Sequence, residues 1–201
     1  MIELKNVTKT ISKKEILSNI NQQFDEGKCY LISGPNGCGK TMLLRMICGL
    51  IKPTTGEISG IKEKSFGVII ENPEFFKHET VLYNLKYLAS IRKKIDVKTI
   101  QKWLKVFNLY DQKNVRVGNL SLGMKQRLAL CQAFMENPDI LLLDEPFNAL
   151  DHENSIILKD IIENEKKNRK IIIIAAHNLS NDLFDLFDYQ IKMENGKIIK
   201  S

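Results

Sequence analysis

The chain alternates between short apolar runs and stretches in which apolar residues recur every three or four positions. Two strands are predicted at 140–144 and 171–176, where the apolar residues are nearly continuous. Runs of this length are typical of strands buried on both faces of a parallel sheet. Further strands are predicted at 2–7, 16–24, 28–33, 57–59 and 66–70, with a polar turn at 12–15 between the first two.

Helical spacing of apolar residues dominates the middle of the chain, from 80 to 108. Other helices are predicted at 41–50, 121–136 and 154–166. The C-terminal segments 189–193 and 198–200 are expected to pair as a hairpin around an Asn-Gly turn. Together these elements indicate one α/β domain with a helical insert.

Composition and charge narrow the class of protein. No apolar stretch approaches the roughly 18–20 residues that span a bilayer, and residues 1–10 lack the apolar core of a signal peptide. We therefore expect a soluble, cytoplasmic protein that needs a partner for any membrane role. The net charge is +6, but Lys and Arg are interleaved with Asp and Glu, so nucleic-acid binding is not expected. The four cysteines form no CxxC pair and are expected to be free thiols.

A glycine-rich segment between the strand at 28–33 and the helix at 41–50 fits the pattern GxxxxGK[ST]. It consists of Gly34, Pro35, Asn36, Gly37, Cys38, Gly39, Lys40 and Thr41. Such a loop closes backbone N–H groups around phosphate oxygens, and the following helix start adds positive potential. Lys40 would reach the β- and γ-phosphates and Thr41 would coordinate Mg²⁺. The alternative, a glycine-rich turn with an exposed lysine, is disfavoured by the flanking strand and helix.

Two carboxylates, Asp144 and Glu145, end a buried strand well downstream of this loop. Asp144 suits a Mg²⁺ ligand, and Glu145 suits a general base for the attacking water, although an Asp-Glu pair can also mark only a strand end. His177 follows the strand at 171–176, and parallel strands present their carboxyl ends at one edge of a sheet. We therefore expect His177 near the γ-phosphate, with a simple capping role as the alternative.

The segment 120–127 reads Leu-Ser-Leu-Gly-Met-Lys-Gln-Arg, in which Ser121 is a candidate helix N-cap. Together with the phosphate loop, the Asp-Glu strand and His177, it resembles the signature motif of the ABC ATPase family. The resemblance covers nearly the whole chain. It implies a P-loop NTPase with a RecA-like core at 1–71 and 131–201, an N-terminal antiparallel β-subdomain, and a helical subdomain inserted at about 72–130.

The resemblance also implies an activity and an assembly. Family members bind ATP with Mg²⁺ and close as head-to-tail dimers with two ATP molecules at the interface, which hydrolysis opens again. This chain would then pair with itself or with a paralogous ATPase subunit. It would power a separate transmembrane permease subunit from the inner face of the cell membrane.

The family's functional positions can be placed residue by residue on this sequence. The catalytic residues would be Lys40, Glu71, Glu145 and His177. The metal ligands would be Thr41, Asp144 and Glu71. Ser121 and Gly123 would contact the γ-phosphate of ATP bound to the opposite subunit, and residues 148–151 would form the D-loop between the two sites. Cys38 would lie among the phosphate-binding amides, so a bulky maleimide on it is expected to block ATP binding.

Three features depart from the usual family pattern. Glu71 stands where the family has a glutamine, and Ser-Leu-Gly-Met at 121–124 replaces Ser-Gly-Gly-Gln. Both resemble the bacitracin-resistance and lantibiotic-immunity branch of exporters, which implies a peptide antibiotic or similar small amphiphile as substrate. The aromatic residue that stacks on adenine is absent, and its place falls at Ile11. Phe75 and Phe76 lie where the family receives a helix of the membrane subunit, or else pack onto the helical insert.

Other functions of this ATPase family fit the sequence less well. Soluble members in DNA repair or chromosome maintenance need long coiled-coil insertions, whereas only about eighty residues separate Lys40 from Ser121. Translation-associated members carry two ATPase units in one chain, and this sequence holds one. A regulatory module without turnover is disfavoured by the presence of Lys40, Asp144, Glu145 and His177.

Overall fold

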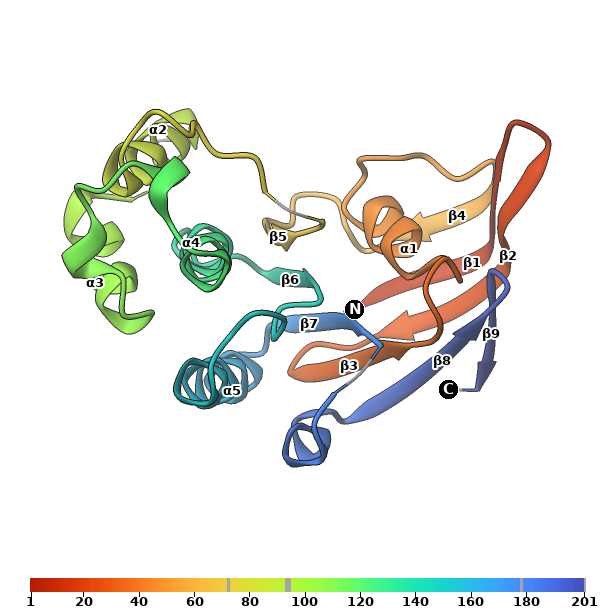
Figure 1. Cartoon of the computed structure of the whole chain (residues 1–201). Coiled ribbons are helices and arrows are strands. Elements are labelled where there is room, and N and C mark those ends of the chain that lie inside the picture. The colour runs from red at the N-terminus through yellow and green to blue at the C-terminus, as the bar shows by residue number, and fades with distance from the viewer. Residues whose placement is uncertain (72, 93–94, 178, 201) are drawn as a thin grey trace.

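The computed structural model describes residues 1–71, 73–92, 95–177 and 179–200. Asn72, which belongs to the motif around Glu71, lies outside the described residues. Two sheets form the framework (Figure 1). The smaller is antiparallel in the order β2-β1-β4 and consists of β1 (Ile2–Ile11), β2 (Lys14–Phe24) and β4 (Thr55–Ser59).

The larger sheet has the strand order β5-β6-β7-β3-β8-β9. It consists of β3 (Lys28–Ser33), β5 (Phe66–Ile69), β6 (Ile140–Asp144), β7 (Ile171–Ala176), β8 (Tyr189–Glu194) and β9 (Lys197–Lys200). Neighbouring strands are parallel except for the hairpin between β8 and β9. This mixed α/β architecture is the one predicted.

The central strands are buried on both faces because their apolar residues are continuous. Along β6, Leu141 and Leu143 join the core on one face, while Ile140 and Leu142 join the core on the other. The first core is covered by helices. The second lies against the antiparallel sheet and the helix that follows the phosphate loop.

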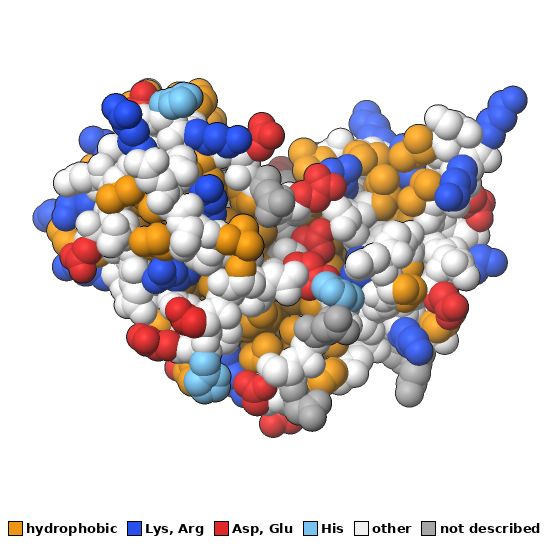
Figure 2. Space-filling model, in the orientation of Figure 1, with side chains coloured by type: hydrophobic (Ala, Val, Ile, Leu, Met, Phe, Trp, Pro, Cys, Tyr) orange, Lys and Arg blue, Asp and Glu red, His pale blue; other side chains and the backbone are white. Residues whose placement is uncertain are grey.

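The helices are α1 (Lys40–Ile47), α2 (Val81–Arg92), α3 (Val97–Val106), α4 (Leu122–Phe134) and α5 (His152–Lys167). α1 packs against both β2 and β6, which places the phosphate loop between the two sheets. α2, α3 and α4 contact one another and form a helical lobe beside β5 and β6 (Figure 1). Figure 2 shows a hollow between this lobe and the rest of the molecule, with acidic side chains in it.

Most predicted elements are confirmed, with shifted ends. The first hairpin is longer than expected, since β1 runs to Ile11 and the turn shrinks to Ser12 and Lys13. The helical stretch from 80 to 108 contains two helices, because Asp96 caps the second by accepting a hydrogen bond from the Thr99 N–H at 2.8 Å. The four cysteines are free, as predicted. Among the described residues, no helix combines the length and apolarity required to cross a membrane.

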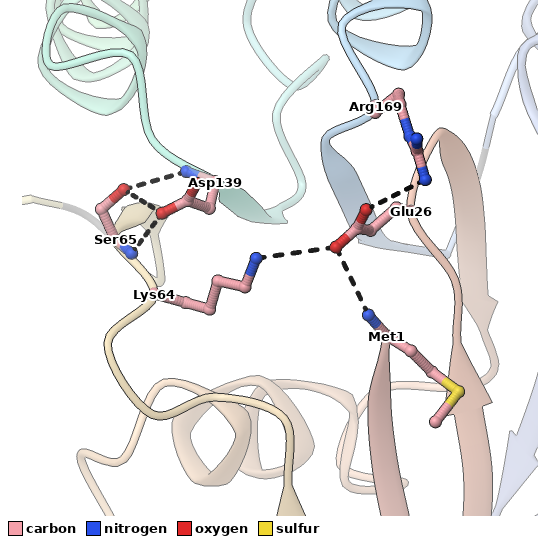
Figure 3. A network of polar contacts seen from close by, with 6 residues as sticks. All are labelled: Met1, Glu26, Lys64, Ser65, Asp139 and Arg169. Carbon is pink, nitrogen blue, oxygen red and sulfur yellow. Dashed lines mark hydrogen bonds and ion pairs between the residues drawn. The ribbon is translucent and has the colours of Figure 1, made fainter.

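The N-terminal ends of the parallel strands carry a network of paired charges (Figure 3). The Glu26 carboxylate faces the Met1 ammonium, Lys64 and Arg169 at 3.4–3.7 Å. Asp139 accepts hydrogen bonds from the N–H and hydroxyl of Ser65 at 2.8 and 2.7 Å, which lower the pKa of its carboxyl. This end of the sheet therefore compensates its own charges.

Candidate nucleotide-binding site

The phosphate loop connects the C-terminal end of β3 to the start of α1. Its conformation requires glycine at Gly34 and Gly39, whose φ angles are +151° and +110°. A Cβ at Gly34 would lie 2.2 Å from the carbonyl oxygen of Met193, and one at Gly39 would lie 2.6 Å from Leu17. The loop is therefore held tightly against β8 and β2.

Lys40 begins α1 and is only 7% exposed. Its Nζ donates hydrogen bonds to the carbonyl oxygens of Gly34 at 2.8 Å and Pro35 at 3.3 Å. The start of α1 has neither a side-chain cap nor an acidic residue in its first turn. A helix start of this kind favours an anion, and the Lys40 ammonium reinforces it.

Thr41 and Asp144 are brought together from α1 and β6. The Thr41 hydroxyl donates a hydrogen bond to Asp144 Oδ2 at 2.6 Å. Burial raises the pKa of the Asp144 carboxyl, and the charges of Glu145 and Glu71 raise it further, against the Thr41 hydrogen bond and Lys40. Adjacent hydroxyl and carboxylate oxygens among surplus negative charge are suitable ligands for Mg²⁺.

Glu145 and His177 meet because β6 and β7 are parallel neighbours. His177 Nδ1 lies 2.5 Å from Glu145 Oε1. The Glu145 backbone is fixed at a φ of +51°, and its N–H donates to the Ala175 carbonyl at 2.8 Å. With a proton on Nδ1, His177 donates to the carboxylate and orients it at the mouth of the phosphate loop.

Glu71 follows β5 and lies at the rim of the same site, with its side chain 62% exposed. Its Oε1 forms an ion pair at 2.7 Å with Nη2 of Arg45, a residue of α1 that sequence reasoning missed. Arg45 is four residues after Thr41, so the two side chains share one face of the helix. That spacing was the available signal.

These residues enclose a pocket of about 350 Å³. It is lined by Ile16, Asn36, Gly37, Gly39, Lys40, Thr41, Met42, Arg45, Glu71, Asp144 and Glu145. Figure 2 shows acidic side chains and a histidine in the hollow between the helical lobe and the rest. The aliphatic wall is Ile16, whereas Ile11 is exposed near the tip of the first hairpin. The Cys38 thiol is buried in the core and does not line the pocket.

Ser121 and Gly123 do not line this pocket. Ser121 caps α4, as predicted, by accepting a hydrogen bond from the Met124 N–H at 3.2 Å. Gly123 lies close to the D-loop, since a Cβ there would be 2.7 Å from the Ala149 carbonyl oxygen. Gln126, which the sequence did not single out, donates to the Pro146 carbonyl at 3.0 Å and links α4 to the Glu145 turn.

The segment after Glu71 is anchored to the helical lobe. The Asn84 side chain is buried, accepts a hydrogen bond from the Phe76 N–H at 2.8 Å and donates to the Phe76 carbonyl at 3.2 Å. Phe75 packs partly against the core, whereas Phe76 is exposed and contacts the Tyr87 ring edge-on at 5.1 Å. Tyr83 is also exposed, and Phe76, Tyr83 and Tyr87 form an exposed aromatic surface on the helical lobe.

Comparison with known proteins shows the family to which the chain belongs. The ABC transporter family matches residues 17–148. The uncharacterized ABC transporter ATP-binding protein YybJ of Bacillus subtilis (strain 168) is 42% identical, over 98% of this chain and 94% of its own. The lantibiotic transport ATP-binding protein SrtF of Streptococcus pyogenes is 34% identical, over 99% and 89%. The dimeric structure of MJ0796, a bacterial ABC transporter cassette, superposes with a TM-score of 0.88 at 27% identity, over 100% and 97%.

Proposed function

The chain belongs to the ATP-binding subunits of ABC transporters, and from this premise we propose that the pocket at the phosphate loop is its Mg²⁺-ATP hydrolysis site. The observation that carries the proposal is the meeting of two pairs at the loop mouth, Thr41 with Asp144 and Glu145 with His177. Such a subunit couples ATP hydrolysis to the work of a transmembrane partner.

Each pair has a distinct task in this proposal. The backbone N–H groups of residues 36–41 and the Lys40 ammonium bind the phosphates, and Thr41 and Asp144 would hold Mg²⁺, which neutralises phosphate charge. Glu145 accepts the proton of the attacking water. His177 keeps the Glu145 carboxylate oriented through the contact of its Nδ1 with Oε1.

The signature residues act in a second copy of the site. Ser121 and the exposed Leu122 begin α4 on the surface, away from the pocket of their own chain. A head-to-tail dimer, with itself or a paralogous subunit, would bring them to the γ-phosphate bound by its partner.

Mixing two inactive variants tests this shared site. Ser121→Arg should abolish hydrolysis but leave ATP binding by the isolated subunit nearly intact, whereas Lys40→Ala should weaken ATP binding itself. A mixed dimer has one interface with both lesions and one with neither, so partial recovery of hydrolysis is expected. Loss of ATP binding by Ser121→Arg alone would contradict action across the dimer.

The aromatic surface of Phe76, Tyr83 and Tyr87 is the proposed contact for the permease. Exposed aromatic residues gathered in one patch are typical of interaction sites. The subunit would then lie on the cytoplasmic face of the membrane through that partner. Tyr87→Asp should reduce the fraction of the protein that sediments with its host's membranes. Ile156→Asp, an exposed site on α5 away from the patch, is the control and should not.

The substrate class is proposed from the relatives and from Glu71. SrtF is named for lantibiotic transport, and the sequence shares the features of that branch. We therefore propose a peptide antibiotic or similar amphiphile as the exported substrate. Deleting the gene should sensitise its host to such peptides, and wild type but not Glu145→Gln should restore resistance. Unchanged sensitivity across a panel of lantibiotics and bacitracin would contradict this assignment.

A further inference from the structure

We propose that Arg45 is a positioning residue for the hydrolysis site, which holds Glu71 away from the metal position until Mg²⁺-ATP takes over that carboxylate. The inference rests on the proposed function, because that function places Mg²⁺-ATP in this pocket. It starts from the 2.7 Å ion pair between Arg45 Nη2 and Glu71 Oε1.

The placement of the two residues makes Glu71 reachable from both sides. Arg45 lies one helical turn beyond Thr41 on α1, and both line the pocket together with Asp144 and Glu71. Glu71 is close enough to Asp144 for its charge to raise the pKa of that carboxyl. The Glu71 carboxylate is thus paired with a guanidinium and lines the same pocket as the predicted metal ligands.

The charges that line the pocket decide whether Glu71 pairs with Arg45 or with Mg²⁺. Three carboxylates line it, Glu71, Asp144 and Glu145. Of its two cations, Lys40 is hydrogen-bonded to loop carbonyls, and Arg45 is the one paired with a carboxylate. Without a metal, Arg45 offsets the repulsion that Glu71 feels from Asp144. A bound Mg²⁺ would compete with the guanidinium for Glu71, because a carboxylate is attracted more strongly to a doubly charged cation than to a singly charged one.

The backbone of Glu71 is suited to a change of partner. Its φ is +58°, a conformation that costs a glutamate energy and persists only where the surroundings hold it. On the other side of the segment, Phe76 is fixed to α2 through Asn84.

The test is a titration of Mg²⁺ against the affinity for a fluorescent ATP analogue, by binding and not by turnover. Arg45→Gln should lower the Mg²⁺ concentration at half-effect by ~2- to 5-fold, the range of a partly exposed ion pair. Glu71→Gln should raise it. In the Glu71→Gln background, Arg45→Gln should shift the midpoint much less, because no carboxylate remains to be released.

An equal shift of the midpoint in both backgrounds would overturn the proposal, since Arg45 would then act only as a general positive charge. No shift in either would overturn it too. Arg45→Lys, which keeps the charge but loses the planar fork, should give an intermediate midpoint and carries the test if Arg45→Gln does not fold. Absence of Mg²⁺-ATP binding by the wild-type protein would instead refute the proposed function itself.

Discussion

The two ends of the six-stranded sheet differ in how far the charges of their carboxylates are compensated. At the N-terminal ends of the parallel strands, Glu26 is surrounded by three cations and Asp139 accepts two hydrogen bonds from Ser65 (Figure 3). At the C-terminal ends, Asp144 has a raised pKa because it is buried beside Glu145 and Glu71. One end is compensated within the chain, and the other carries a surplus of negative charge around a helix start that favours an anion.

This difference separates structural charges from functional ones. Structural carboxylates are stabilised as anions by the groups of the fold that surround them. Carboxylates whose pKa is raised because their charge is not compensated cluster where a bound ligand supplies the missing charge. The surplus at the C-terminal end is the complement of a metal, and the free helix start with Lys40 is the complement of phosphates. Both complements are met together by Mg²⁺-ATP, which has a cation and phosphates in fixed proximity.

The largest expected contrast between the two ends is in hydrolysis. Glu145→Gln should reduce the ATPase rate ~10²- to 10⁴-fold, because it removes the general base. ATP should still bind, and the variant should accumulate as an ATP-bound dimer by size-exclusion chromatography. The matched change at the other end, Glu26→Gln, should leave the rate unchanged. Hydrolysis by Glu145→Gln at the wild-type rate would show that Glu145 is not the base.

Nucleotide affinity should differ next. Lys40→Ala should weaken ATP binding ~10- to 100-fold, the value of a hydrogen bond to a charged group. Lys64→Ala, which removes a cation from the Glu26 network, serves as the control and should leave the affinity unchanged. Titration with a fluorescent ATP analogue measures both. Equal affinity of Lys40→Ala and wild type would contradict the assignment of the phosphate loop.

Sequence patterns were sufficient to predict the strands of the sheet and to place the site residues at their carboxyl ends. Continuous apolar runs identify β6 and β7 because strands buried on both faces leave no polar positions. The carboxyl ends of such neighbours meet at one edge, and this places Glu145 beside His177 as expected. Helix ends were less accurate, although Asp96 with Thr99 three residues later was a readable cap signal.

Side-chain partners across elements could not be predicted in the same way. Helical spacing places Arg45 on the Thr41 face of α1, but its pairing with Glu71 depends on where α1 lies relative to the end of β5, which no periodicity encodes. The Cys38 thiol points into the core. This direction could not be predicted, because the loop between β3 and α1 has no repeating pattern that would show which side chains face inward. Gln126 bonds to backbone carbonyls of another segment, and such contacts leave no trace in spacing.

Stability should respond with opposite signs at the two ends. At neutral pH, Asp144→Asn should raise the Tm of the nucleotide-free protein, because it removes an ionised carboxylate that burial penalises. Asp139→Asn should lower the Tm, because it removes the charge that strengthens two hydrogen bonds. At this exposed site the loss should be up to ~1 kcal/mol, or ~2–4 °C for a chain of this size.

The pH dependence follows from the direction of each pKa shift. Asp144 has a raised pKa when folded, so its contribution is present at low pH and is lost as pH rises through the folded pKa. Asp139 has a lowered pKa, so its contribution is present at neutral pH and is lost as pH falls through the folded pKa. The differences in Tm between each variant and the wild type should both shrink below about pH 4, where the carboxyls are protonated. Tm changes of the same sign for Asp144→Asn and Asp139→Asn at pH 7 would contradict the contrast between the two ends of the sheet.

The smallest effect concerns thiol labelling at the phosphate loop, where the structure changes the expectation. The Cys38 thiol is only 4% exposed and lies in the core beneath the loop, so a maleimide reaches it only when the loop opens. Cys48, at the other end of α1, is partly exposed. Cys38 should therefore react more slowly than Cys48, and Mg²⁺-ATP should slow it a further few-fold by holding the loop closed. Cys48 should be unaffected, because its exposed surface does not depend on the loop.

Peptide mass spectrometry of labelled protein, with and without nucleotide, measures both rates in one sample. Equal protection of both thiols would indicate a general stabilisation by ATP, and no protection of Cys38 would place the nucleotide away from this loop.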